Sequence, residues 1–439
     1  MTLAELKETV NKILAMAAEH GATSAEADIG TGNGLSVTAR MGEVETVEHQ
    51  RDKALSVTVY VDHCKGSAGS ADFSDKALEE TVAAACTIAR NTSPDEYAGL
   101  LQPQYLAREI PDLDLYHPWD ITPEEAVERT IACENEARAM DKRIVNSDGA
   151  MLNTYSGSSV YGNSNGFLGG WDWSSHSIDC TLIAEQDGHM QRDGWYSRRR
   201  DHNELDEFGN VAREAARRTL ARLGARSIST RRVPVIFEAP AAASLFSAFI
   251  GAISGGALYR RSSFLLDKKG ERVFPEFLRI SERPHIKKGI GSAAFDDEGM
   301  ATRDRDIVSE GILRDYVLSA YSARKLGLEP TGNAGGVHNL MVSHGERGLE
   351  ELIADMGEGL LITDMIGFGV NQVTGDYSRG AAGFWIENGQ IRYPVEEITV
   401  AGNLIDMYRN IVAVGSDVDR RGNIQTGSVM IDAMTVAGA

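Results

Sequence analysis

The chain has 439 residues, of which 42% are hydrophobic and 25% are charged, and its formal net charge is -20 at pH 7. This length predicts two or three globular domains, and the acidic balance argues against nucleic acid or an anionic membrane surface as the main partner. The first residues, Met-Thr-Leu-Ala-Glu-Leu-Lys-Glu, have neither the basic nor the apolar region of a secretory signal. We therefore expect a cytoplasmic protein.

The cysteines agree with this location. There are four, all within the first 180 residues, and no two of them form a C-x-x-C pair. This spacing matches neither a disulfide framework nor a zinc ribbon. We expect reduced and mostly buried thiols at Cys64, Cys86, Cys133 and Cys180.

The amino-terminal segment is predicted to form a helix, an antiparallel meander and a second helix. Thr2 and Glu5 make a capping box in front of an apolar stripe with helical spacing. Alternation with a period of two follows, and hairpin turns are expected at residues 41–42 and 62–63. The strands between these signals are expected at 35–40, 44–48 and 55–61. Ser74 is the expected cap of the second helix, whose predicted apolar face contains Leu78, Val82, Ala85 and Ile88.

A connector with four prolines separates this unit from a second one of similar plan. Thr122-Pro-Glu-Glu125 is a helix start, with threonine as the cap and proline at the first helical position. A charged amphipathic helix, expected at about 204–223, closes the second unit. The two units resemble each other in architecture and not in sequence. Strand character in the second unit is found at 151–155, 159–161, 177–183 and 188–192.

An uncharged stretch from Ala239 to Tyr259 ends at Arg260-Arg261. Pro240 suits the first turn of a helix, and Gly255-Gly256 are expected to end it. The length would fit a membrane span, but the stretch is rich in Ala, Gly and Ser, which argues against one. A buried core helix and a helix at a catalytic site remain as interpretations. The apolar stripe consists of Leu245, Phe249 and Ile253, with Phe246 and Ile250 alongside.

The remaining third of the chain is rich in glycine and less regular. A hairpin is expected at 306–317, and helices at 319–326 and from 347 onward. Strands are expected at 359–363, 383–387 and 427–432, and Gly-rich loops, which often line a site or an interface, at 332–336, 367–369 and 375–383.

These elements predict an α+β protein with two helix–antiparallel-meander–helix units, followed by a larger, Gly-rich mixed α/β C-terminal domain. The expected boundaries are 1–92 for the first unit, 93–119 for the connector, 120–228 for the second unit and 229–439 for the C-terminal domain.

Catalytic motifs are scarce in this sequence. None of the ten histidines shows the H-E-x-x-H spacing of a zinc peptidase helix, and no nucleophile elbow, Walker A motif or dinucleotide fingerprint occurs. His338 and His344, with Glu346 nearby, could hold a metal ion from a loop. Two polar segments could be either structural turns or contact surfaces for a peptide or a partner. The candidate contact residues are Asn163 and Asn165 in the first segment, Asp376, Tyr377, Ser378 and Arg379 in the second, and in addition His338.

Five segments carry a family resemblance. They are G-N-S-N-G-F at 162–167, G-A-I-S-G-G-A-L-Y-R-R-S-S-F-L-L-D at 251–267, Y-S-A-R-K-L-G-L at 321–328, G-D-Y-S-R-G-A-A-G-F-W at 375–385 and G-N-L-I-D-M-Y-R-N-I-V-A-V-G-S-D at 402–417. In these segments the chain resembles the PmbA (TldE) branch of the TldD/PmbA family, whose members were once labelled modulators of DNA gyrase. The resemblance spans essentially the whole chain.

The resemblance implies a heterodimeric, zinc-dependent peptidase that acts on unfolded peptides. In that family the TldD subunit carries His-Glu-x-x-x-His on a helix ending in Arg-Arg, and a late cysteine. Alignment on Arg260-Arg261 places these three side chains at Ser247, Ala248 and Ala252, and no cysteine follows Cys180. Neither serine nor alanine binds Zn²⁺ usefully. The resemblance therefore implies a chain without catalytic, cofactor or metal residues of its own, whose TldD-like partner supplies zinc.

Three hypotheses follow from this reading. In the first, the chain is the non-metal subunit and presents strand edges or Gly-rich loops to an extended substrate. In the second, it is a binding or regulatory protein without proteolysis, for example a homodimer. In the third, it is an independent hydrolase that uses His338, His344 and Glu346, or the loop at 376–379.

Overall fold

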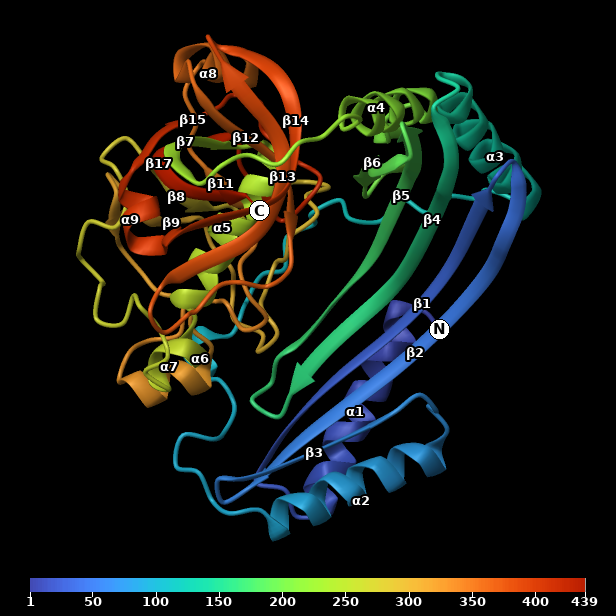
Figure 1. Ribbon diagram of the computed structural model, residues 1–439. Helices are drawn as coiled ribbons and strands as arrows, with labels where there is room; N and C mark the ends of the chain where they lie inside the picture. The colour runs from blue at the N-terminus through green and yellow to red at the C-terminus, as the bar shows by residue number, and fades with distance from the viewer. Residues whose placement is uncertain (439) are drawn as a thin grey trace.

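A computed structural model describes residues 1–438 of the chain. Figure 1 shows a long, curved sheet in blue and green, and a C-terminal body in yellow to red beside it. The curved sheet has the strand order β3-β2-β1-β4-β5-β6, and all its neighbouring strands are antiparallel. Its elements are α1 (Leu3–Glu19), β1 (Ser24–Arg40), β2 (Glu43–Val61), β3 (Cys64–Ser70), α2 (Asp75–Asn91), α3 (Pro123–Ala139), β4 (Ile144–Asn163), β5 (Leu168–Gln186), β6 (His189–Arg199) and α4 (Phe208–Ala221).

The two helix–meander–helix units are present, and the pairing of β1 with β4 joins their strands into one sheet. Alternate residues of β1 point to the same face. Along the strand, the residues on the buried face belong first to one hydrophobic cluster and then to another. Ala27 and Ile29 pack with α1 and α2, whereas Leu35 and Val37 pack with α3 and α4. Both helix pairs therefore cover the same face of the sheet, one pair at each end.

The local signals of the first unit are confirmed in detail. Thr2 and Glu5 form the reciprocal hydrogen bonds of a capping box at the start of α1, and the turns at 41–42 and 62–63 have positive φ angles. The expected strands at 44–48 and 55–61 are parts of one strand, β2. The four cysteines are free, and all except the half-buried Cys64 are buried.

One expected core residue of α2 is exposed. Ile88 has 46% of its surface accessible, while Cys86 and Ala89 are fully buried. At 100° per residue, Ile88 lies about 80° from Leu78 and about 120° from Val82 around the helix axis, so its side chain points past the sheet. Its apolar character alone made it look like a core residue.

The C-terminal body contains two sheets. A six-stranded sheet has the order β14-β13-β12-β7-β17-β15, and a five-stranded sheet has the order β10-β9-β8-β11-β16. The pairs β7–β12 and β11–β16 are parallel, and the other pairs are antiparallel. The strands are β7 (Arg231–Phe237), β8 (Ile280–Glu282), β9 (Arg305–Ser309), β10 (Ile312–Leu313), β11 (Leu340–Val342), β12 (Gly359–Ile366), β13 (Asp376–Glu387), β14 (Gln390–Asn403), β15 (Ile411–Val414), β16 (Ile424–Gln425) and β17 (Val429–Gly438).

Helices complete this body and confirm the predicted α+β class. They are α5 (Ala239–Ala252), α6 (Gly255–Tyr259), α7 (Ala320–Leu326), α8 (Leu349–Met356) and α9 (Leu404–Arg409). Helix α5 packs in one hydrophobic cluster with strands of both sheets, whereas α8 packs against another face of the six-stranded sheet. Among residues 1–438, no helix combines the length and the apolar character that a membrane crossing requires.

Two expectations for this body were wrong in detail. Gly255-Gly256 do not end the uncharged helix, because α5 stops at Ala252 and Gly255 begins α6. The segment 375–383, expected as a Gly-rich loop, forms most of β13 and pairs with β14. Its glycines serve close strand packing, since a Cβ added at Gly383 would overlap the carbonyl oxygen of Leu361 on the neighbouring strand.

Candidate functional site

Helix α5 follows β7 directly and is fixed by hydrogen bonds from elsewhere in the C-terminal body. At its start, the amide of Ala239 donates to the hydroxyl of Ser428 over 3.1 Å. Further along, the hydroxyl of Tyr408 donates to the carbonyl of Leu245 over 2.8 Å. Small side chains allow the strands to approach the helix closely, and Phe249 fills the space between the sheets and is fully buried. The helix is therefore a core element.

The three positions of α5 singled out by the resemblance differ in their surroundings. The Ser247 side chain is exposed, whereas Ala248 is 9% exposed and Ala252 is completely buried. The Gln372 side chain, from the connection between β12 and β13, lies against this part of α5. Its Nε2 donates to the Ala248 carbonyl over 3.3 Å, and its Oε1 is buried without a hydrogen-bond partner among residues 1–438.

These residues do not fit a zinc ion. A hydroxyl and two methyl groups offer neither an imidazole nor a carboxylate, which are the groups that bind Zn²⁺ and activate its water. Gln372 contributes an amide, and no group of three or more His, Cys, Asp or Glu side chains within residues 1–438 is placed to hold a metal.

The two loop histidines are not brought together. His338 precedes β11 and His344 follows it. His344 and Glu346 are exposed, and the His344 Nδ1 lies 2.7 Å from the carbonyl oxygen of Gly345. The His338 ring is turned inward. Burial lowers its pKa below the usual value, and its Nε2 has no hydrogen-bond partner within the described part of the chain. The residues proposed for an independent hydrolase are therefore separated, because His338 is turned into the protein and His344 and Glu346 are exposed.

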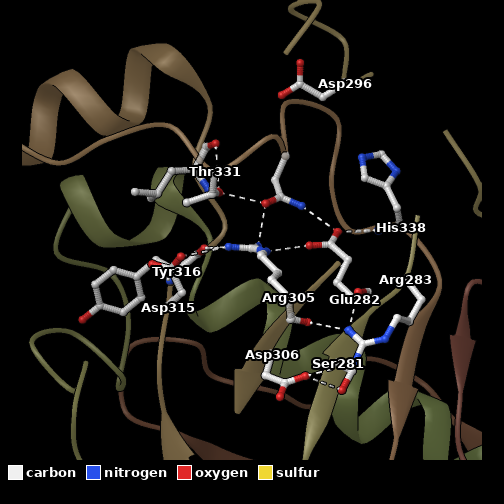
Figure 2. Close-up of polar contacts among 12 residues, drawn as sticks. Ser281, Glu282, Arg283, Asp296, Arg305, Asp306, Asp315, Tyr316, Thr331 and His338 are labelled. Atoms are coloured by element: carbon white, nitrogen blue, oxygen red, sulfur yellow. Dashed lines mark hydrogen bonds and ion pairs between the residues drawn. The ribbon is translucent and has the colours of Figure 1, made fainter. Parts of the chain in front are cut away.

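A buried polar network that the sequence did not reveal surrounds the backbone of His338 (Figure 2). One carboxylate oxygen of Glu282 accepts hydrogen bonds from the His338 amide, at 2.7 Å, and from Nδ2 of Asn333, at 2.8 Å. The other accepts from Nε of Arg305 at 2.7 Å. Arg305 also donates to Oδ1 of Asn333 at 2.6 Å. The network thus fastens the Gly-rich loop at 332–336 to β8 and β9.

The polar segment at 376–379 lies in β13, and its side chains divide between the two faces of the strand. Tyr377 is 2% exposed and belongs to the core. Asp376 is exposed and accepts a hydrogen bond from the Thr374 hydroxyl over 2.7 Å. Nε of Arg379 donates to the Gly367 carbonyl over 3.1 Å, and Ser378 is exposed. These contacts lie within the β12–β13 hairpin, so the four side chains do not converge on one point.

The asparagines at 163 and 165 form the turn between β4 and β5. Oδ1 of Asn163 accepts from the amide of Asn165 over 3.1 Å, which is an Asx turn, and Nδ2 of Asn165 donates to the Leu101 carbonyl over 2.8 Å. Next to this turn, Phe167 packs edge to face on Phe295, with 4.9 Å between the ring centroids. The turn therefore docks the curved sheet on the C-terminal body.

Comparison with known proteins supplies the family. Three sequence families of PmbA/TldA metallopeptidase domains match the chain. Domain 1 matches residues 25–89, the central domain matches 116–223 and the C-terminal domain matches 230–438. The chain belongs to the PmbA/TldD family. This confirms the resemblance found in the sequence.

Relatives within the PmbA/TldD family match nearly the full chain. The metalloprotease PmbA of Escherichia coli O157:H7 is 48% identical over 433 residues, which are 99% of this chain and 96% of the relative. The metalloprotease PmbA homolog of Haemophilus influenzae is 46% identical over 435 residues, again 99% and 96%. This chain is thus similar over its whole length to proteins named metalloproteases.

Two solved structures share the fold. A Bacteroides thetaiotaomicron protein named as a modulator of DNA gyrase superimposes with a TM-score of 0.94 at 28% identity and covers 99% of both chains. TldE of Thermococcus kodakarensis superimposes with a TM-score of 0.86 and covers 98% of this chain and all of its own. Its identity is 21%, so it supports the fold alone.

Proposed function

We propose that this chain is the non-metal subunit of a two-chain, zinc-dependent peptidase that acts on unfolded peptides, and that a TldD-like paralogue supplies the zinc. The observation that carries the proposal is the chemistry of α5. In the alignment on Arg260-Arg261, the family's metal-ligand positions fall on this helix at Ser247, Ala248 and Ala252. None of these three side chains can bind zinc usefully. The names of the E. coli and H. influenzae relatives support a role in proteolysis.

An open strand edge supports a role in holding extended peptides. In β2, only residues 55–61 pair with β3. The preceding stretch, 43–54, pairs with β1 on one side and leaves its other edge without a neighbouring strand among residues 1–438. Its side chains are exposed on both faces, apart from the half-exposed Gln50. Such an edge can add a strand from another chain through main-chain hydrogen bonds.

The proposal includes a cytoplasmic location, supported by four free thiols. It includes neither nucleic acid nor a membrane as a partner, because the net charge is -20. A homodimer in the absence of the paralogue is compatible with it.

Reconstitution tests the proposal. The pure chain, mixed at equimolar ratio with a TldD-like paralogue, is expected to form a heterodimer by light scattering and to cleave an unfolded peptide. Elemental analysis should find zinc in the mixture and none in this chain alone. Cleavage by the pure chain that a chelator abolishes would contradict the proposal. Failure to form a heterodimer would favour the hypothesis of a binding protein without proteolysis.

A further inference from the structure

A cavity of about 630 Å³ lies on the face of the curved sheet opposite α3 and α4, over strands β4, β5 and β6. The strand alternation explains its character. The even-numbered residues of β5, such as Ile178 and Cys180, are buried under the helices, so the odd-numbered ones point to the other face. The side chains that define the cavity are those of Asn153, Tyr155, Ser175, Ser177, Asp179 and Tyr196.

Asp179 is the one carboxylate in this lining, and its charge is unmatched. No hydrogen bond or ion pair to its side chain exists within residues 1–438, although the residue is half-buried. Its cross-strand neighbours are Met151 and Tyr196, neither of which is a cation. Burial raises the pKa of Asp179 to about 6, and no nearby cation opposes that shift. Such a carboxylate weakens the fold at neutral pH, and a strongly perturbed acid in a cavity often marks a binding function.

Two cations lie around the cavity, and neither makes an ion pair with Asp179 within residues 1–438. Arg198 is part of the lining, and its Nε donates to the hydroxyl of Ser175 over 3.4 Å, so its charge has no acidic partner in the described part of the chain. Arg421, from the C-terminal body, lies 4.2 Å from the Tyr196 ring centroid. Its guanidinium is held by two hydrogen bonds of 2.9 Å to Asp419, so its charge is already neutralised. The Tyr196 ring therefore already has the Arg421 guanidinium against it, while Asp179 makes no ion pair within residues 1–438.

The other groups of the cavity suit a small cation that donates several hydrogen bonds. The hydroxyl of Ser36 donates to Oδ1 of Asn153 over 2.7 Å, and Nδ2 of Asn153 donates to the Ser177 hydroxyl over 3.3 Å. This ladder presents oxygen atoms beside Asp179. An ammonium group donates three hydrogen bonds and is attracted both by a carboxylate and by the face of an aromatic ring. A divalent metal would need more carboxylate or carbonyl ligands than one acid provides.

We propose that this cavity binds a primary ammonium group of an extended peptide, with the Asp179 carboxylate as its anionic partner. The inference rests on the proposed function, because it assumes that peptides are the ligands. It adds a substrate class, namely peptides with a lysine side chain or a free amino terminus in reach of the curved sheet.

The test measures binding of fluorescent peptides to the full chain at pH 7.5 and low salt. One peptide has an acetylated amino terminus and a central lysine, a second has norleucine in place of lysine, and a third has norleucine and a free amino terminus. The lysine peptide should bind about tenfold more tightly than the acetylated norleucine peptide. The third peptide shows whether an α-ammonium group serves equally well.

Asp179→Asn should abolish the preference for the ammonium group. The matched control is Glu185→Gln, which removes one negative charge from the same face of β5, about 20 Å further along the strand, and should keep the preference. Lowering the pH to 5 should also weaken the preference in the unmodified chain, because Asp179 becomes protonated while lysine stays charged. The lysine-to-norleucine comparison needs no variant, so it holds even if a variant folds poorly.

Equal binding of all three peptides, binding of none, or an unchanged preference in Asp179→Asn would overturn the cavity inference. The proposed function is judged separately by zinc content and peptide cleavage in the reconstituted heterodimer. If the heterodimer cleaves peptides and the three peptides bind this chain equally, the cavity inference fails and the proposed function stands. If the lysine preference is found and no heterodimer forms, the proposed function fails.

Discussion

Nε of Arg305 donates to a carboxylate oxygen of Glu282 over 2.7 Å, and the two side chains are only 9% and 3% exposed. The pair joins β8 to β9. It also carries the Gly-rich loop at 332–336, because Asn333 bonds to both members. Removing two charges from water is costly, and the cost is offset only where geometry is good and the remaining donors and acceptors are satisfied. Glu282 meets this condition with three hydrogen bonds.

Glu282→Gln is expected to reduce the free energy of unfolding by about 3 kcal/mol, because it leaves a buried guanidinium with less compensation. The loss should stay near the lower end of the usual range, since Asp315 still accepts from Arg305 over 3.1 Å. Urea denaturation measures the change. Glu350→Gln, at an exposed position in α8, is the matched control and should change stability by less than about 0.5 kcal/mol. A loss below about 1 kcal/mol for Glu282→Gln would contradict the interpretation of the network.

The second prediction concerns pH. Burial raises the pKa of Glu298 to about 7, although its carboxylate accepts a hydrogen bond from the Ala320 amide over 2.7 Å. Because this pKa is higher in the folded than in the unfolded chain, the folded chain binds more protons between about pH 4.5 and pH 7. The free energy of unfolding therefore falls as the pH rises through that window. At pH 8 the folded chain bears the full destabilisation of a buried, ionised Glu298.

Glu298→Gln should remove this cost, because glutamine can still accept from the Ala320 amide. The variant is expected to be more stable than the unmodified chain by about 2 kcal/mol at pH 8 and about equally stable at pH 5. Thermal unfolding of the variant and the unmodified chain at both pH values measures the stability difference. Because both proteins are compared at the same pH, contributions from other titrating groups cancel. A constant difference across the pH range would contradict the assignment.

Local signals in the sequence predicted local structure well. The capping box of Thr2 and Glu5 predicted the start of the first helix, and the hairpin turns lie where they were predicted. Both succeed because capping and turn geometry depend on residues that are neighbours in the sequence. The pairing of β1 with β4 could not be predicted, since the choice of a strand partner about a hundred residues away leaves no local pattern. Glu282 and Arg305 were missed for the same reason, because widely separated charges in a sequence look like ordinary surface residues.

The candidate site was predicted unevenly. The five sequence motifs correctly predicted the family. The uncharged stretch correctly predicted a helix in the core, which is α5. The polar segment at 376–379 was expected as a loop because glycines usually mark turns, yet here they allow close strand packing in β13. The unmatched charge of Asp179 had no sequence signal, since an acid on the polar face of an alternating strand is ordinarily solvated.

A third prediction tests the packing of α2 on the curved sheet. A Cβ added at Gly66 in β3 would overlap the carbonyl oxygen of Ala85 and the amide nitrogen of Ala89. Backbone atoms cannot turn aside as a side chain can, so α2 would have to move. Gly66→Ala is expected to cost about 2 kcal/mol or more. Gly32→Ala, in β1 of the same sheet, has its nearest neighbour at 3.8 Å and should cost less than about 1 kcal/mol. Equal melting temperatures for the two variants would contradict this account.

The last prediction asks whether α5 can be returned to metal binding by substitution. Ser247→His should be tolerated, because that side chain is exposed. Ala252→His should reduce the free energy of unfolding by about 3 kcal/mol or more, since it forces a larger and polar ring into a position that is completely buried. The two variants are compared by urea denaturation, and the double variant is then dialysed against zinc and analysed for bound metal. We expect an unstable protein without stoichiometric zinc, because the space that a second imidazole needs is occupied by the core of this chain. A double variant of unchanged stability that binds one zinc ion would show that only the ligands, and not the packing around α5, separate this chain from a metal-binding subunit.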